Sequence, residues 1–214
     1  MRNYIHFEHY LNLLREDIYP TSTDDAHYDW SLDAINWSVG KCDNVHTVLD
    51  VGCGNGFSHL MFNKYGIEYT GVTLGKDDLS IAKHSNFNVV EMDMSFLQFD
   101  TEKFDIVYSR HSLEHSPFPL LTLMEWHRVS KQYLILVLPS TEYWGIGGRN
   151  HYSVFTKDQW YYVFERSGWE VIASQDFMST DTLWVKHHVD HNGTPLEWVG
   201  HPKPIEYRYI LRKI

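Results

Sequence analysis

The stretch Val48-Leu49-Asp50-Val51-Gly52-Cys53-Gly54-Asn55-Gly56 decides the fold. An apolar run that ends in a glycine-rich turn predicts a buried strand, followed by a loop where a ligand can approach the backbone closely. The dinucleotide-binding fingerprint G-x-G-x-x-G has a different spacing, because Phe57 stands where that fingerprint places its third glycine. Thr73 stands where that fingerprint expects an acidic residue, about 20 residues later. The sequence therefore disfavours a nicotinamide dehydrogenase.

Around this stretch, apolar runs bounded by turn residues alternate with helical patterns. This alternation predicts a parallel sheet with helices on both faces. We expect strands near residues 46–51, 68–73, 88–92, 104–109, 133–138, 170–177 and 205–213. We expect helices near residues 56–65, 77–85, 118–130 and 156–167.

Length and composition favour one domain over residues 1–214, since 43% of the residues are hydrophobic and can form a sizeable core. No apolar run is long enough to span a membrane, and residues 1–6 lack the apolar core of a signal peptide. We therefore expect a cytoplasmic protein without a membrane partner. Its two cysteines, Cys42 and Cys53, are too few for a disulfide framework and are expected to be reduced thiols.

The formal charge of −10 bears on the partners of the protein. Proteins that grip phosphate backbones usually present clustered lysine and arginine, and none is clustered here before residues 208–213. That terminal segment alternates aromatic and basic residues, which is more typical of a strand. The sequence disfavours a nucleic-acid partner.

Four segments resemble, in order, the motifs of the class I S-adenosylmethionine (SAM) methyltransferases. Residues 48–56 resemble the first motif, and residues 104–115 (FDIVYSRHSLEH) resemble the fourth strand with the H-x-L-E-H turn of the small-molecule branch. Residues 133–139 resemble the fifth strand, and residues 151–172 the entry to the last helix and sixth strand. The chain is similar to this family, in its type 11 and type 23 branch, over about residues 45 to 175.

The resemblance implies a Rossmann-like α/β fold. Its sheet would have seven mostly parallel strands in the order 3-2-1-4-5-7-6, with helices on both faces and an antiparallel last strand beside the fifth. Residues 1–40 are expected to form an N-terminal helical cap over the active site. Residues 178–204 are expected to be an insertion between the last two strands.

The resemblance also implies SAM as cofactor and a set of residues that bind it. The implied set is Asp50, Gly52, Cys53, Gly54, Gly56, Thr73, Leu74, Asp93, Met94 and Ser109. Asp50 would orient the glycine loop and the ammonium group, or simply cap loop amides. Thr73 offers one hydroxyl where many relatives chelate the ribose with an acid, so Asp77 or Asp78 could compensate, unless both are only acids at a helix N-terminus. Asp93 and Met94 match the adenine-binding pair, although a strand-end aspartate in a turn is the alternative.

Three histidines are the candidates for catalysis: His111, His115 and His151. Because His111, Glu114 and His115 are spaced i, i+3 and i+4, a helical turn would place them on one face. His151 lies in a segment that folds back over the same sheet edge in the family. The same four residues resemble the divalent-metal set of small-RNA terminal 2'-O-methyltransferases. Metal binding is one interpretation, and a metal-free general base or substrate contact is the other.

The sequence thus favours a SAM-dependent methyltransferase that acts on oxygen or nitrogen of a small molecule. Two alternatives remain: a metal-assisted RNA 3'-terminal 2'-O-methyltransferase, and a non-catalytic SAM-binding protein. The sequence indicates neither the methyl acceptor nor the oligomeric state.

Overall fold

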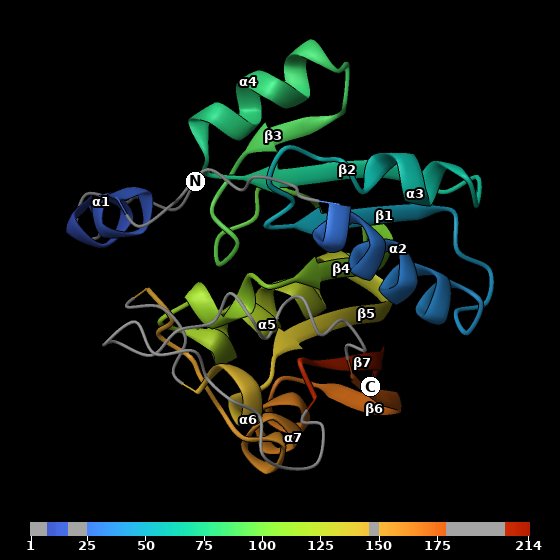
Figure 1. Cartoon of the computed structure of the whole chain (residues 1–214), viewed down its shortest axis with the longest axis vertical. Coiled ribbons are helices and arrows are strands. Elements are labelled where there is room, and N and C mark those ends of the chain that lie inside the picture. The colour runs from blue at the N-terminus through green and yellow to red at the C-terminus, as the bar shows by residue number, and fades with distance from the viewer. Residues whose placement is uncertain (1–7, 17–24, 146–149, 179–203) are drawn as a thin grey trace.

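The computed structural model describes residues 8–16, 25–145, 150–178 and 204–214. Seven strands form one sheet in the order β3-β2-β1-β4-β5-β7-β6, from β3 at the top of Figure 1 to β6 at the bottom. Neighbouring strands from β3 to β5 are parallel, whereas β7 runs antiparallel to both β5 and β6. The predicted fold class and strand order are confirmed.

The strands are β1 (Thr47–Val51), β2 (Glu68–Thr73), β3 (Val89–Glu91), β4 (Phe104–Arg110), β5 (Ser130–Pro139), β6 (Trp169–Phe177) and β7 (Glu206–Lys213). The helices are α1 (Glu8–Glu16), α2 (Asp25–Val39), α3 (His59–Asn63), α4 (Lys76–His84), the 3-10 turn η2 (Leu113–His115), α5 (Pro119–Val129), α6 (Thr141–Trp144) and α7 (Lys157–Arg166).

Side-chain alternation along the strands divides the core into two layers. Val48 and Ile106 pack on one face of the sheet with residues of α2 and α3. Leu49 and Val107, the next residues along the same strands, pack on the other face with residues of α5 and α7. Both faces of the central strands are therefore buried, which explains their continuous apolar runs.

Two predicted segments fall partly outside the described residues. Of residues 1–40, the structure describes α1 and α2. Of the predicted insertion 178–204, it describes only the two end residues.

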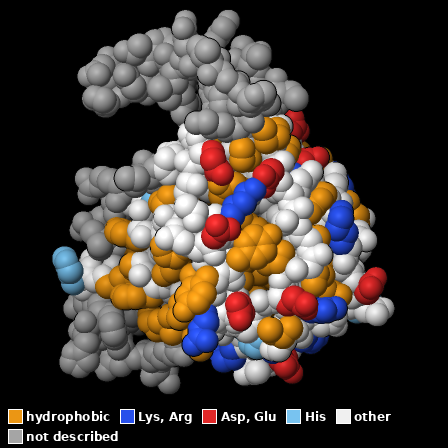
Figure 2. Space-filling model, turned by 90° about the horizontal axis from the view of Figure 1, so that it is seen from below, with side chains coloured by type: hydrophobic (Ala, Val, Ile, Leu, Met, Phe, Trp, Pro, Cys, Tyr) orange, Lys and Arg blue, Asp and Glu red, His pale blue; other side chains and the backbone are white. Residues whose placement is uncertain are grey.

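No helix among the described residues is long and apolar enough to cross a membrane. On the face seen in Figure 2, Lys and Arg side chains lie among Asp, Glu and apolar side chains and form no continuous basic surface there.

Candidate functional site

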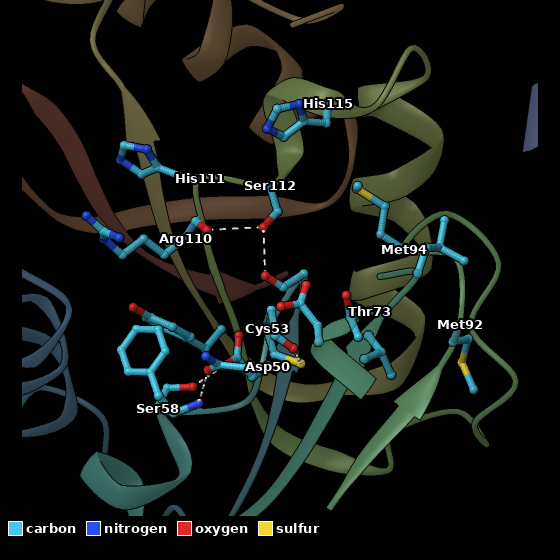
Figure 3. A pocket seen from close by; sticks show the side chains of 18 of the residues that line it. Asp50, Cys53, Ser58, Thr73, Met92, Met94, Arg110, His111, Ser112 and His115 are labelled. Atoms are coloured by element: carbon cyan, nitrogen blue, oxygen red, sulfur yellow. Dashed lines mark hydrogen bonds between the residues drawn. The ribbon is translucent and has the colours of Figure 1, made fainter. Parts of the chain in front are cut away.

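A cavity of about 290 Å³ lies where the parallel strands β1, β2, β3 and β4 end. Ligands of open α/β sheets bind at this edge, beyond the carboxyl ends of the strands. Figure 3 shows Arg110 and His111 on one side of the cavity, Met92 and Met94 on the other, and His115 between them at the top of the view. Nine residues predicted from the sequence line it: Asp50, Gly52, Cys53, Gly54, Thr73, Leu74, Met94, His111 and His115.

The glycine turn is held tightly against the end of β4. Gly52 has φ of +75°, and a Cβ atom there would lie 2.1 Å from Oγ of Ser112. The Ser112 hydroxyl lies 3.3 Å from the Gly52 carbonyl and 3.1 Å from that of Arg110. The backbone N–H groups of Gly52 and Cys53 both donate to the Val72 carbonyl on β2. Position 52 therefore requires glycine for its backbone conformation and for the close approach of Ser112.

Gly56, which the sequence also predicted to bind the cofactor, is not among the residues that line the cavity. Its φ is +81°, and a Cβ atom there would lie 2.7 Å from a methyl carbon of Val89. The third glycine of the motif thus allows the turn to pack against β3.

Asp50 is buried beneath the turn at the end of β1. Its Oδ2 accepts hydrogen bonds from the hydroxyls of Ser58 and Tyr69 (2.9 Å for Tyr69). Burial raises the pKa of Asp50 to about 6, and the two hydroxyls oppose this shift by stabilising the carboxylate. This oxygen therefore accepts from two side-chain hydroxyls. The alternative interpretation of Asp50, as a cap of loop amides, would have required backbone N–H donors instead.

At the end of β2, the Thr73 hydroxyl accepts a hydrogen bond from the backbone N–H of Gly75 at 3.1 Å. Asp78 also lines the cavity and is buried, whereas its neighbour Asp77 is exposed. Burial first, and then the charge of Asp77, raise the pKa of Asp78. A second oxygen-bearing side chain therefore lies beside Thr73.

Two of the predicted cofactor residues, Asp93 and Ser109, do not line the cavity. Asp93 is buried, and its Oδ1 accepts from the Ser95 N–H at 2.7 Å. Burial raises the pKa of Asp93, while hydrogen bonds from Ser95 and Tyr10 oppose the rise. Ser109 is fully buried and donates to the Val51 carbonyl on β1, which is a contact within the sheet.

The three predicted histidines divide into a pair and a single residue. The rings of His115 and His151 lie edge to face with centroids 4.8 Å apart. His111 is apart from this pair, with φ of +50° and its Nε2 3.1 Å from Oε1 of Glu206. Burial and the charge of Arg110 lower the pKa of His111 to about 4, although Glu206 opposes this. His111 is therefore a neutral imidazole near pH 7.

The possible metal ligands among the described residues are Glu114, His115 and His151, whose ligand atoms lie within 4.8 Å of one another. The predicted fourth member, His111, does not belong to this group. Ligand atoms of a formed tetrahedral zinc site with bonds near 2.1 Å are roughly 3.3 Å apart. Burial raises the pKa of Glu114 to about 8, so its carboxyl is protonated near pH 7. To hold a metal ion, the three ligand atoms would have to move closer together, and the Glu114 carboxyl would have to lose its proton.

Several lining residues were not selected from the sequence. Leu14 comes from α1, and His27 and Ser31 come from α2, which carry no recognisable motif. Tyr108 and Arg110 lie two residues apart on β4, so strand alternation could have indicated that they share a face. The other unselected lining residues are Asn55, Phe57, Ser58, Val72, Met92, Ser112, Asn150 and Tyr152.

Comparison with known proteins adds to this geometry. Residues 49–137 match the family model described as "Methyltransferase domain". The ubiquinone biosynthesis O-methyltransferase of Coxiella burnetii (strain RSA 493 / Nine Mile phase I) is 29% identical over 131 residues, which cover 58% of this chain and 50% of that protein. The chain thus spans about half the length of this curated relative.

Solved structures with the same fold include a SAM-dependent methyltransferase from Archaeoglobus fulgidus. Its TM-score is 0.69 at 19% identity, covering 86% of this chain and 94% of that one. The [4+2]-cyclase SpnF has a TM-score of 0.67 at 19% identity, covering 92% and 84%. Likeness at this identity shows the fold alone, so the reaction has to be argued from the site.

Proposed function

We propose that this protein, whose residues 49–137 belong to the class I SAM-dependent methyltransferase family, transfers the methyl group of SAM to a small molecule. The observation that carries the proposal is the glycine turn. Gly52 is held at positive φ against Ser112, and the turn opens into a cavity at the ligand-binding edge of the sheet. Gly54, with φ of +55°, lines the same cavity, so a ligand there can approach its backbone closely.

The residues around the cavity fit the three parts of SAM. The methionine part would lie along Gly52 and Gly54, with the Asp50 carboxylate beneath the turn as partner for the ammonium group. Asp78 and Thr73 would bind the ribose hydroxyls, and the Asp78 carboxylate can accept from both. The thioethers of Met92 and Met94 would pack on the adenine.

Methyl transfer from a sulfonium leaves a neutral thioether, so alignment of the acceptor with the methyl group supplies much of the catalysis. SAM provides the methyl group when it is bound. The acceptor would lie toward His115 and Arg110, which both line the cavity.

His115 is the favoured general base for an acceptor that is protonated at working pH. Its Nδ1 lies 3.1 Å from the Asn150 carbonyl, a contact that requires the ring proton on Nδ1 and leaves the basic lone pair on Nε2. His111 is disfavoured as the base, since a pKa of about 4 makes its imidazole weakly basic. The curated relatives are named O-methyltransferases, which favours oxygen over nitrogen as the acceptor atom.

A metal-assisted RNA-terminal methyltransferase is the second candidate, favoured by the grouping of Glu114, His115 and His151. The wide spacing of their ligand atoms and the net charge of −10 count against it. A non-catalytic SAM-binding protein is the third candidate.

The first test is calorimetric binding of SAM and S-adenosylhomocysteine to wild type and to Gly54→Arg. The Gly40→Arg variant is the matched control, because Gly40 is exposed and no atom lies within 4 Å of a Cβ atom placed there. We expect micromolar binding to wild type and Gly40→Arg, and no binding to Gly54→Arg. Equal binding to all three proteins would contradict the placement of the cofactor.

The second test separates the three candidate functions. Transfer from labelled SAM is measured with phenols, amines and an RNA 3' end, each with and without EDTA. Transfer to a small molecule that is unaffected by EDTA supports the proposal. Loss of RNA methylation in EDTA, restored by one metal ion, would support the second candidate. Tight SAM binding without transfer to any acceptor would support the third.

A further inference from the structure

Arg110 and Tyr108 line the cavity from the end of β4, and the proposed function assigns them no part in binding or catalysis. They are two residues apart on one strand, so both side chains project from the same face of the sheet. Figure 3 shows the Arg110 side chain beside that of His111 at the cavity wall.

The Arg110 guanidinium shares its counterion with a second arginine. Nε and Nη2 of Arg110 donate to Oε1 of Glu206 at 3.1 and 2.6 Å. Nε and Nη2 of Arg208 donate to Oε2 of the same carboxylate at 3.2 and 3.1 Å. The Glu206 and Arg208 side chains are fully buried, and that of Arg110 is 10% exposed. Two buried guanidiniums thus flank one buried carboxylate.

The second carboxylate of this cluster, Asp33, balances the charge of the two arginines only weakly. Arg208 also pairs with Asp33 of α2 at 2.5 Å, but the Asp33 side chain is 58% exposed and its charge is screened by water. Among the described residues, Glu206 is the only carboxylate in an ion pair with Arg110. Glu206 is thus the buried carboxylate that both guanidiniums share, and an anion at the cavity wall would add a second partner for Arg110.

Tyr108 adds an independent observation. The residue is 2% exposed, and its hydroxyl has no hydrogen-bond partner among the described residues. Buried hydroxyls are nearly always hydrogen-bonded, and leaving one without a partner is unfavourable. The hydroxyl belongs to a residue that lines the cavity, so a ligand there can supply the missing acceptor.

We propose that Arg110 and Tyr108 form a binding site for a carboxylate group in this cavity. Arginine supplies the charge and its N–H donors, of which Glu206 accepts only part, and tyrosine supplies an O–H donor. Two ligands of the reaction could carry the group: SAM, through its methionine carboxylate, or a methyl acceptor that is a carboxylic acid. The choice of these ligands rests on the proposed function.

The experiment measures ligand binding by calorimetry to wild type, Arg110→Met and Tyr108→Phe. The cofactor arm compares S-adenosylhomocysteine with its decarboxylated analogue, S-adenosyl-3-thiopropylamine, which keeps the amine. The acceptor arm compares 3,4-dihydroxybenzoate with catechol, each with and without saturating S-adenosylhomocysteine. Arg212→Met is the control, because the side chains of Arg212 and its partner Glu170 are both about half exposed.

We expect the variants at 108 and 110 to weaken one carboxylate ligand at least tenfold, and its counterpart without the carboxylate less than twofold. Loss confined to S-adenosylhomocysteine assigns the site to the cofactor, and loss confined to 3,4-dihydroxybenzoate assigns it to the acceptor. Affinities equal to wild type in both arms would overturn the proposal. If wild type binds no S-adenosylhomocysteine at all, the proposed function fails, while the benzoate arm without cofactor still decides the carboxylate site.

Tyr108→Phe separates ligand binding from stability. Because the removed hydroxyl has no hydrogen-bond partner in the described part of the chain, the melting temperature of the ligand-free variant should equal or exceed that of wild type. A lower melting temperature with unchanged carboxylate affinity would assign the hydroxyl to the fold and overturn its part in the site. This variant also keeps the test decisive if Arg110→Met, which removes one partner of Glu206, fails to fold.

Discussion

Asp50 affects both the stability of the fold and the proposed binding of the cofactor. Its carboxyl is buried, and its pKa is about 6 in the folded protein against 3.8 in an unfolded chain. Between pH 4 and 6 the folded state holds a proton that the unfolded state releases. The free energy of unfolding therefore falls as pH rises through this window, and stays lower above it.

Asp50→Asn should remove this pH dependence, because the amide oxygen can still accept from Ser58 and Tyr69. The gain in unfolding free energy of the variant over wild type should grow by up to about 3 kcal/mol from pH 4 to pH 8. Urea denaturation of both proteins at the two pH values measures this. SAM affinity should fall in the variant, since the neutral amide is a weaker partner for the ammonium group. A stability difference independent of pH would contradict the raised pKa.

Asp78 gives a second prediction at this scale, with a control beside it in the sequence. Asp78 is buried at the cavity and Asp77 is exposed on the same turn of α4. If Asp78 accepts from the ribose hydroxyls, Asp78→Ala should weaken S-adenosylhomocysteine about tenfold or more. Asp77→Ala should change the affinity less than twofold. Equal effects of the two substitutions would assign them to the general charge of the helix N-terminus.

At the scale of elements, the sequence predicted the sheet because its signals are local. Each parallel strand is an apolar run, and each run is bounded by turn residues that can be identified without knowing the partner strand. The strand order came from the family resemblance, since periodicity alone does not determine it. Two details were missed: β5 begins at Ser130, and α6 is a short helix whose Ser140 N-cap hydroxyl accepts from the Tyr143 N–H.

The contact between α2 and β7 could not be predicted, because its partners are far apart in the sequence. Arg208 of β7 pairs with Asp33 of α2 and lies over the ring of Phe177, 3.7 Å from its centroid. Arg208→Met removes two hydrogen bonds to the buried Glu206, whose charge Arg110 still balances, so we expect a loss of about 1.5–3 kcal/mol in unfolding free energy. Asp33→Ala removes a half-exposed partner and should cost less than about 1 kcal/mol. Denaturant titration checks both, and equal losses would contradict a buried Arg208–Glu206 pair as the dominant interaction.

At the scale of the whole molecule, the sequence predicted one wall of the cavity better than the other. The glycine turn, Thr73 and Met94 belong to motifs that follow strands, so their positions are set by the sheet. Leu14 and His27 reach the cavity from α1 and α2, whose placement depends on tertiary packing. Gly56, Asp93 and Ser109 belong to motifs but do not line the cavity, since a motif residue can serve the packing around a site.

Because the cavity is lined by residues from many elements, a bound ligand should stabilise the fold as a whole. A ligand in it would touch residues of α1, α2, the ends of β1, β2 and β4, and the segment around Asn150. S-adenosylhomocysteine at 100 times its dissociation constant should add about 2.7 kcal/mol to the unfolding free energy. For a domain of this size, each kcal/mol shifts the melting temperature by about 2–4 °C, so the melting temperature should rise by about 5–11 °C.

Differential scanning calorimetry at several ligand concentrations measures this shift. Gly54→Arg should show no rise at the same concentrations, and Gly40→Arg should match wild type. A rise in Gly54→Arg equal to that of wild type would place the ligand away from the glycine turn, whatever the activity of the protein.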